Sequence, residues 1–261
     1  MIPKPYITAW SKHSPWTSNY LVEQDLIIER ALSEIFSDPD LNKSLAFRGG
    51  TAIHKLFFHP QPRYSEDIDL VQTDSGPIGD ILTLVREKLS FLGEAKYIRS
   101  AHNNTLTYRF DTEFEPIIKP KLKIEINTRE HFTVFGYQEV DHKIENEWFN
   151  GKCKIKTFSL EELLGTKLRA LFQRRKGRDL FDLWYAHTNT TLDISKIIET
   201  FHKYLEHDEL LVSSREYILG LEEKIKDDSF HGDVAGLIRP EINYDGNDAW
   251  KIIQLEIISK I

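Results

Sequence analysis

Two aspartates separated by one residue stand in the middle of an apolar stretch, RYSEDIDLV, at residues 63–71. On a β-strand, side chains at positions i and i+2 project from one face, so Asp67 and Asp69 point together while Ile68 and Leu70 enter the core. Two adjacent carboxylates raise each other's pKa unless a cation lies between them. Mg²⁺ is a suitable cation, because it prefers carboxylate oxygens together with the phosphates of a nucleotide. The alternative is an exposed edge strand whose outward residues are acidic.

A glycine pair precedes this strand in the segment RGGTAIHKLF, residues 48–57. We expect Gly49 and Gly50 to end one strand and Thr51 to cap the helix that follows. Free backbone N–H groups at that helix start would face a ligand, and glycine lets a phosphate approach the main chain closely. A plain tight turn between strand and helix explains the same residues.

Glu125 is the third candidate carboxylate. It lies on the polar face of the strand PKLKIEINTRE, in which Leu122, Ile124 and Ile126 alternate with polar residues. If this strand pairs beside EDIDLV, Glu125 could bind a metal or help to activate an attacking hydroxyl, since two-metal transfer sites commonly use three acids. It could equally be a surface partner of Lys121 or Lys123.

The second half of the sequence contributes a lysine and two acids. Lys167 lies on the apolar stripe of a helix that starts with the Ser159–Glu162 capping-box pattern. A lysine on a buried face requires an anion, either a phosphate or an internal aspartate, unless its stem reaches the edge of the stripe. Asp179 and Asp182 are three apart on the next helix and share a face beside the core, as partners of a salt bridge or as the lining of a site.

The elements that must position these residues change in type along the chain. Helices are expected at 19–37, about 51–58 and 81–93, with short strands at LAFRGG and EDIDLV and further strands within 96–135. The segment SDPDLNKS interrupts the first helix. From about residue 158 nearly all of the pattern is helical, so we expect an α+β fold with a mixed α/β half followed by an α-helical half.

Composition excludes several classes of protein. No apolar run approaches the roughly 20 residues that span a bilayer, and the N-terminus lacks a signal-peptide core, so we expect a cytoplasmic protein without a membrane partner. Cys153 is the only cysteine, which excludes an intrachain disulfide and a thiolate zinc site. The net charge of −7 argues against non-specific coating of nucleic acid, although residues 167–178 concentrate basic side chains.

Taken in order, the blocks FRGGTAIHKLF, RYSEDIDLV, KIEINTRE and KLRALFQRRKGRDLFDLWYA resemble the AbiEii/AbiGii (DUF1814) abortive-infection toxins. These are nucleotidyltransferase-like toxins of type IV toxin–antitoxin systems and include the MenT toxins. The resemblance spans about residues 47–186. It implies a polymerase-β-like nucleotidyltransferase core with a mixed sheet at residues 1–150, and a helical domain at 151–261 that contributes the second wall of the active-site cleft.

The resemblance also implies roles for single residues. Gly50, Thr51 and Lys55 match the family's first motif, Asp67 and Asp69 its metal ligands, Lys167 its later lysine, and Asp182, with Asp179 beside it, its late aspartate. Ser65 matches a position at which a kinase-type antitoxin silences some members by phosphorylation. Lysine replaces arginine in the first motif, which keeps the charge but loses bidentate geometry, so GTP, CTP and ATP are not distinguished as substrates.

We therefore expect a Mg²⁺-dependent toxin that transfers a nucleotide from an NTP to RNA, with the tRNA 3′ end as one known target in the family, and a cognate antitoxin encoded nearby. In this interpretation Gly49, Gly50, Thr51 and Lys55 hold the triphosphate, and Arg174, Arg175 and Lys176 attract the RNA. Two alternatives are a transferase that modifies a small molecule, as antibiotic nucleotidyltransferases do, and a non-catalytic nucleotide-binding switch protein.

Overall fold

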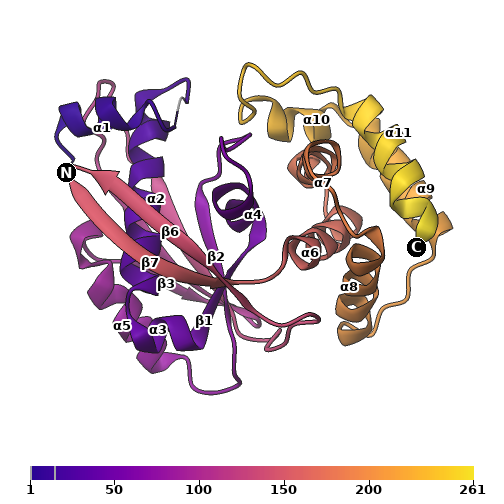
Figure 1. Cartoon of the computed structure of the whole chain (residues 1–261), viewed down its shortest axis with the longest axis horizontal. Helices are drawn as coiled ribbons and strands as arrows, with labels where there is room; N and C mark the ends of the chain where they lie inside the picture. The colour runs from indigo at the N-terminus through magenta and orange to yellow at the C-terminus, as the bar shows by residue number, and fades with distance from the viewer. Residues whose placement is uncertain (1, 15) are drawn as a thin grey trace. The chain divides into compact units, whose positions relative to one another are not determined.

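The computed structural model describes residues 2–14 and 16–261 and divides the chain into two compact units (Figure 1). The first unit ends at Phe158, and the second runs from Ser159 to Ile261. The boundary expected after residue 150 falls inside a strand, Phe149–Thr157, that belongs to the first unit. The first unit contains both helices and strands, and only helices follow in the second, as the sequence pattern predicts.

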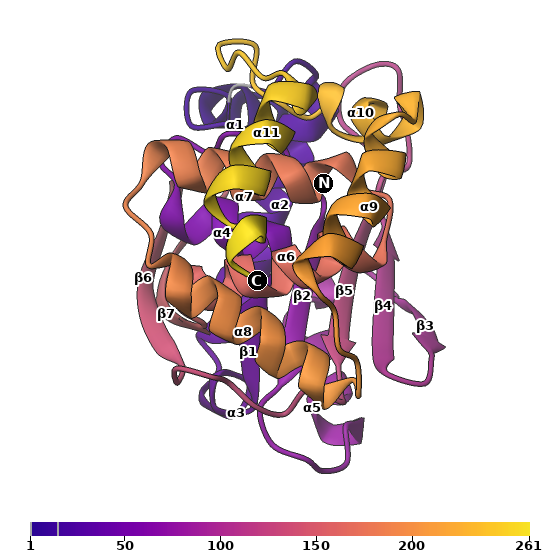
Figure 2. The ribbon, with the colours of Figure 1, turned by 90° about the vertical axis from the view of Figure 1, so that its right-hand side faces the viewer.

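One seven-stranded mixed sheet forms the centre of the first unit, with strand order β3-β4-β5-β2-β1-β7-β6 (Figure 2). The central strand β2 pairs antiparallel with β1 and parallel with β5. The strands are β1 (Leu45–Arg48), β2 (Asp67–Gln72), β3 (Lys96–Arg99), β4 (Asn103–Arg109), β5 (Lys121–Asn127), β6 (Gln138–Asn146) and β7 (Phe149–Thr157).

Alternation of apolar and polar residues determines how the two central strands are oriented. In β5, Leu122, Ile124 and Ile126 are fully buried, and in β2 so are Ile68 and, almost completely, Leu70. Their neighbours therefore project from the opposite face, because the side-chain period of a strand is two residues. This confirms the orientation predicted for Asp67, Asp69 and Glu125.

The helices of the first unit cover the sheet. They are α1 (Lys4–Trp10), α2 (Asn19–Phe36), α3 (Pro39–Ser44), α4 (Gly49–Phe57) and α5 (Gly79–Lys88), followed by a 3₁₀ turn, Ser90–Leu92. α2 packs on β7 and β6, whereas α4 packs on β2 and β1. The segment SDPDLNKS does more than interrupt α2: Asp38 accepts hydrogen bonds from the N–H groups of Asp40 and Leu41, and so begins α3.

Helices alone make up the described secondary structure of the second unit. They are α6 (Leu160–Gln173), α7 (Gly177–Asn189), α8 (Ile194–His207), α9 (Ser214–Ile225), α10 (Asp228–Ala235), α11 (Gly246–Glu256) and the 3₁₀ turn Ile258–Lys260. α6 packs against both α7 and α8. Ser159 caps α6 as expected, but the Glu162 carboxylate accepts a hydrogen bond from Tyr204 instead of completing the box. Within the described residues, no helix has the length and apolarity needed to cross a membrane.

Candidate active site

Carboxylates from two neighbouring strands gather on one face of the sheet in the first unit. The parallel register of β2 and β5 sets Asp67 opposite Lys123 and Asp69 opposite Glu125. The strand that contains Glu125 therefore pairs beside the strand with the two aspartates, which is the arrangement that a role for Glu125 requires. The Lys123 ammonium lies 3.6 Å from Asp67 Oδ2 and 3.9 Å from Glu125 Oε1.

Negative charge is in excess at this face. Burial raises the pKa of Asp67 to about 6, and the charges of Asp69, Glu66 and Glu125 add to the increase, while Lys123 opposes it. The lysine is itself partly exposed, so its charge compensates the acids incompletely. A second cation at this place would relieve the remaining repulsion.

The donor chemistry of these acids fits Mg²⁺ that arrives with a nucleotide. In the described residues, no three His, Cys, Asp or Glu side chains are grouped so that they could hold a metal ion by themselves. Mg²⁺ is usually bound by one or two carboxylates together with substrate phosphates, and not by a cage made only of protein groups. Burial raises the pKa of Asp67 and the three neighbouring acids raise it further, so a cation bound there would stabilise the ionised carboxylate. Glu125 as a metal ligand stays a prediction.

The glycine turn lies against the second aspartate. α4 begins at Gly49, whose φ of +77° is in the left-handed region, and a Cβ at this position would come within 2.2 Å of Asp69 Oδ2. Glycine is therefore required both by the backbone conformation and by the close approach of the carboxylate. This contact brings the first turn of α4 next to the acids of β2.

Thr51 does not cap α4, contrary to the sequence prediction. Arg48 occupies the N-cap position, and no side chain among the described residues caps this helix start. The Thr51 hydroxyl donates to the carbonyl oxygen of Asp67 at 2.5 Å and lies 2.6 Å from the Ser65 hydroxyl. Both hydroxyl groups are buried, so they fasten the start of α4 to the start of β2. Direct contact of Thr51 or Ser65 with a nucleotide stays a prediction.

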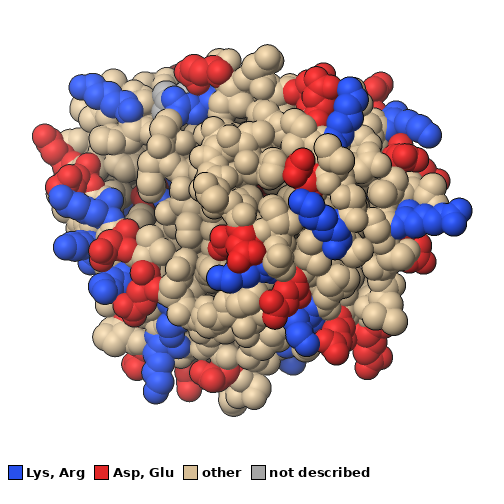
Figure 3. Space-filling view, turned by 45° about the vertical axis from the view of Figure 1, so that its right-hand side comes forward, with Lys and Arg blue, Asp and Glu red and all other residues tan. Residues whose placement is uncertain are grey.

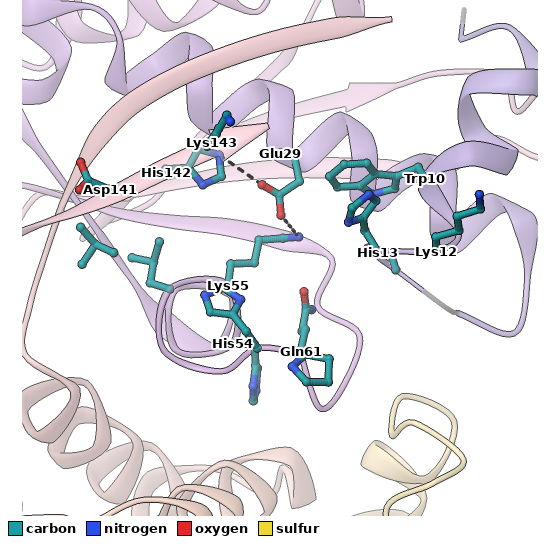
Figure 4. A pocket seen from close by; sticks show the side chains of 15 residues that line it. Trp10, Lys12, His13, Glu29, His54, Lys55, Gln61, Asp141, His142 and Lys143 are labelled. Atoms are coloured by element: carbon teal, nitrogen blue, oxygen red, sulfur yellow. Dashed lines mark hydrogen bonds and ion pairs between the residues drawn. The ribbon is translucent and has the colours of Figure 1, made fainter. Parts of the chain in front are cut away.

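Lys55 reaches acids that the sequence analysis did not identify. Its ammonium lies 2.8 Å from Asp25 Oδ1 and 2.7 Å from Glu29 Oε1, both on α2, and its side chain is 1% exposed. Glu29 is also 3.2 Å from His142 Nε2 (Figure 4). A cavity of about 520 Å³ borders this group. One feature of the sequence could have indicated this acidic pair: Asp25 and Glu29 are four residues apart on one helix, which places both acids on the same side.

The second unit holds the later lysine and acids together. The Lys167 ammonium on α6 lies 2.9 Å from Asp179 Oδ1 and 3.1 Å from Asp182 Oδ2 on α7, and both aspartates are fully buried. Burial alone would raise the pKa of Asp179, but Lys167 and Arg174 hold it below its usual value. Of the two anions expected for Lys167, the structure shows internal aspartate.

The three basic residues expected to attract RNA are exposed but paired. On the face drawn in Figure 3, basic and acidic side chains are interspersed. Each of the three basic side chains has an acidic side chain of the same unit within 4 Å. The negative charge of the acid offsets the positive charge, so the long-range attraction for RNA is weaker. The pairs are Arg174 with Asp179, Arg175 with Asp227, and Lys176 with Asp233.

Comparison with known proteins identifies the family to which the chain belongs. Residues 30–250 match the sequence-family model of the nucleotidyl transferase AbiEii toxins of type IV toxin–antitoxin systems. The chain belongs to the AbiEii family. The match includes both strands with the clustered acids, the glycine turn, and the Lys167 group. No curated protein sequence matches the chain.

Solved structures show the same fold as this AbiEii chain. MenT4, a nucleotidyltransferase toxin from Mycobacterium tuberculosis, is 14% identical, with a TM-score of 0.61 over 98% of this chain and 90% of MenT4. JHP933 from Helicobacter pylori is 18% identical, with a TM-score of 0.55 over 93% of each chain. A nucleotidyltransferase-like structure from H. pylori is 17% identical, with a TM-score of 0.52 over 93% of this chain and 96% of the other. The nucleotidyltransferase fold predicted from the sequence is thereby confirmed.

Proposed function

We propose that this AbiEii protein is a Mg²⁺-dependent nucleotidyltransferase toxin that transfers a nucleotide from an NTP to RNA. The main support is the contact between Gly49 and Asp69, because it sets a helix start, suited to phosphate, against a face with excess carboxylate. A nucleotide bound with Mg²⁺ satisfies both halves of this arrangement. Its phosphates meet backbone N–H groups and its metal meets the acids.

Asp67 and Asp69 would hold the metal, which neutralises charge on the phosphate oxygens when bound. The N–H groups at Gly49 and Gly50 would bind the triphosphate. In the transfer, a hydroxyl oxygen of the RNA bonds to the α-phosphorus, the bond from that phosphorus to the bridging oxygen of the β-phosphate breaks, and pyrophosphate leaves. Glu125 is placed beside Asp69 by the strand register and would accept the proton of the attacking hydroxyl.

We propose a second set of residues that take part in the reaction, namely Lys167, Asp179 and Asp182. The two carboxylates would orient the ammonium of Lys167, whose side chain is 7% exposed, toward a substrate oxygen. Loss of the lysine would then reduce transfer by more than the accompanying loss of stability explains.

The test is incubation of the protein with each of four labelled NTPs, Mg²⁺ and total RNA. We expect the wild type to label RNA and Asp67→Asn to reduce labelling by about 10²–10⁴-fold, because positioning and electrostatics dominate this chemistry. Asp111→Asn is the matched control, since Asp111 is an exposed aspartate of the same unit. Absence of labelling by the wild type, with growth arrest retained in Asp67→Asn and Lys167→Ala, would refute the proposal.

The pairing of the exposed basic residues with acids favours one second candidate, transfer to a small-molecule hydroxyl. RNA binding weakens steeply as salt rises, whereas binding of an uncharged acceptor does not. The KM for the acceptor should therefore be measured between about 50 and 200 mM salt. A steep rise in KM with salt indicates RNA, and a KM that does not change indicates an uncharged small molecule.

The family also supports a proposed partner, a cognate antitoxin. We expect its gene beside the gene for this protein. Co-expression should relieve growth arrest by the wild type, and an unrelated small protein expressed from the same vector serves as the control.

A further inference from the structure

Lys55 is the centre of a buried ionic cluster that joins α4 to α2. Its ammonium bonds Asp25 at 2.8 Å and Glu29 at 2.7 Å, and these acids are one turn apart on α2. Asp25 also accepts a hydrogen bond from Trp10 Nε1 at 3.0 Å and another from Ser14. We call Lys55, Asp25 and Glu29 the α2–α4 cluster; Figure 4 shows Lys55 and Glu29.

The ammonium cannot leave this cluster without a large cost. Lys55 and Asp25 have side chains that are each 1% exposed. If Lys55 turned toward a nucleotide, two carboxylates would lose this cation, that of Asp25 buried and that of Glu29 with a side chain 14% exposed. Breaking a buried ion pair from one side is strongly destabilising, because an uncompensated charge stays in a poorly solvated place.

The same helix carries the proposed phosphate-binding turn. α4 is only nine residues long and is attached to β2 through Thr51, whose hydroxyl bonds the carbonyl of Asp67. Lys55 follows Thr51 by four residues, so the two lie on one side of α4, one turn apart. Gly49 begins this helix against Asp69. A short helix held at both points keeps its first N–H groups at a fixed place beside the acids.

We propose that Lys55 is a positioning residue that fixes α4, and through it the Gly49–Gly50 turn, and that it does not contact the triphosphate. This inference rests on the proposed function for its catalytic part, since it concerns the site for the nucleotide. The attachment of α4 to α2 is independent of any activity.

Three variants separate positioning from phosphate binding. Lys55→Met removes the ammonium from both acids, while Asp25 keeps its hydrogen bonds from Trp10 and Ser14 and Glu29 its contact with His142. It should lower the melting temperature by roughly 6–20 °C. The triple variant Asp25→Asn, Glu29→Gln, Lys55→Met removes all three charges and keeps the side-chain sizes, so it should recover most of that loss. Lys88→Met is the control, because Lys88 pairs with Asp38 at the surface of the same unit. It should leave the melting temperature nearly unchanged.

The decisive readout is the KM for the NTP in the triple variant, together with direct binding of a fluorescent NTP. A positioning role predicts a KM within about threefold of the wild type once stability is restored, whereas Lys55→Met alone shows a lower kcat. A role as phosphate ligand predicts a KM raised tenfold or more in both variants, since the positive charge is absent from both. That second result would overturn the inference.

Hydrogen–deuterium exchange of the α4 amides tests the attachment without any substrate. Exchange should rise in Lys55→Met and return toward the wild-type rate in the triple variant, with the amides of β4 unchanged in both. Unchanged exchange in α4 of Lys55→Met would refute the attachment. A wild-type protein that neither binds nor transfers a nucleotide refutes the proposed function instead, while the exchange and melting results still decide the cluster.

Discussion

Replacement of Asp67 by asparagine is expected to stabilise the folded protein at neutral pH while it reduces nucleotide transfer by about 10²–10⁴-fold. The reason is that burial disfavours the charge of Asp67, and repulsion from Asp69 and Glu125 adds to this cost, while Lys123 offsets part of it. Asparagine has almost the same shape and removes the charge. Residues that serve a metal site are commonly kept at such a cost in stability.

The magnitude follows from the pKa of Asp67, which is about 6 in the folded protein against the ordinary 3.8. One pKa unit corresponds to about 1.4 kcal/mol, so the ionised carboxylate costs at most about 3 kcal/mol. The side chain is 28% exposed, and water screens part of this interaction, so we expect about 1–2 kcal/mol. Because the pKa of Asp67 is higher in the folded than in the unfolded protein, the carboxyl group of Asp67 causes no loss of stability below about pH 4. The destabilisation by its ionised form develops as the pH rises through 6.

The assay is urea unfolding of the wild type and Asp67→Asn at several pH values from 4 to 8, without divalent cations. The free energy of unfolding should be equal for the two proteins near pH 4 and larger for the variant above pH 7. Asp111→Asn is again the control, because this exposed aspartate pairs only with Lys119 among the interactions the structure shows for it. Mg²⁺ with an NTP should then stabilise the wild type and not the variant.

A variant that is less stable than the wild type at pH 7, or a difference that does not depend on pH, would refute this reasoning. Either result would mean that the charge of Lys123 cancels the repulsion between the carboxylates, so that the ionised form of Asp67 does not destabilise the fold. The acidic face would then offer no electrostatic reason to bind a metal.

Three further changes test other parts of the structure. Lys167→Met should lower the free energy of unfolding by about 3–5 kcal/mol, because it removes the ammonium that lies against two fully buried carboxylates, of which Asp179 keeps its pair with Arg174; a loss below 1 kcal/mol in urea would contradict this. Gly49→Ala should cost more than about 1–2 kcal/mol through its positive φ and its collision with Asp69, whereas Gly220→Ala, in a helix with open space around it, should gain up to about 1 kcal/mol. Thermal melts of both glycine variants decide between these signs. Burial raises the pKa of Cys153 to about 11, so a thiol reagent at pH 8 should modify the native protein far more slowly than the urea-unfolded one, and equal rates would be contrary to expectation.

Local sequence pattern was enough to predict the strands that hold the acids. The alternation around Ile68 and around Ile124 identified two strands and the side of each that faces away from the core. The spacing of Asp179 and Asp182 likewise predicted a shared face, and an internal aspartate was one of the two anions expected for Lys167. In each case the relevant neighbours lie within a few residues, so the period of the element determines the geometry.

Contacts between segments far apart in the chain were not predictable in this way. Lys55 meets Asp25 thirty residues away, and a match to a phosphate-binding motif gave no sign of that partner. The hairpin of β6 and β7 at residues 138–157 was also not predicted, because its outward residues are nearly all polar and its apolar residues are few. Thr51 was expected as a cap, yet its hydroxyl bonds the chain at Asp67. Tertiary contacts determined each of these outcomes.

The buried hydroxyl pair of Ser65 and Thr51 has a consequence for the speed of any covalent modification there. Ser65 is 9% exposed and its hydroxyl lies 2.6 Å from that of Thr51, so an enzyme that transfers a group to it must wait until this segment separates from α4. When opening and closing are fast, the rate of modification is proportional to the fraction of time spent open. An opening free energy of about 3 kcal/mol would make the rate more than a hundredfold slower than on an unfolded peptide of the same sequence. A ligand that holds α4 against β2 would slow the modification further, so occupancy of the site and modification of Ser65 would compete through the same hydrogen bond.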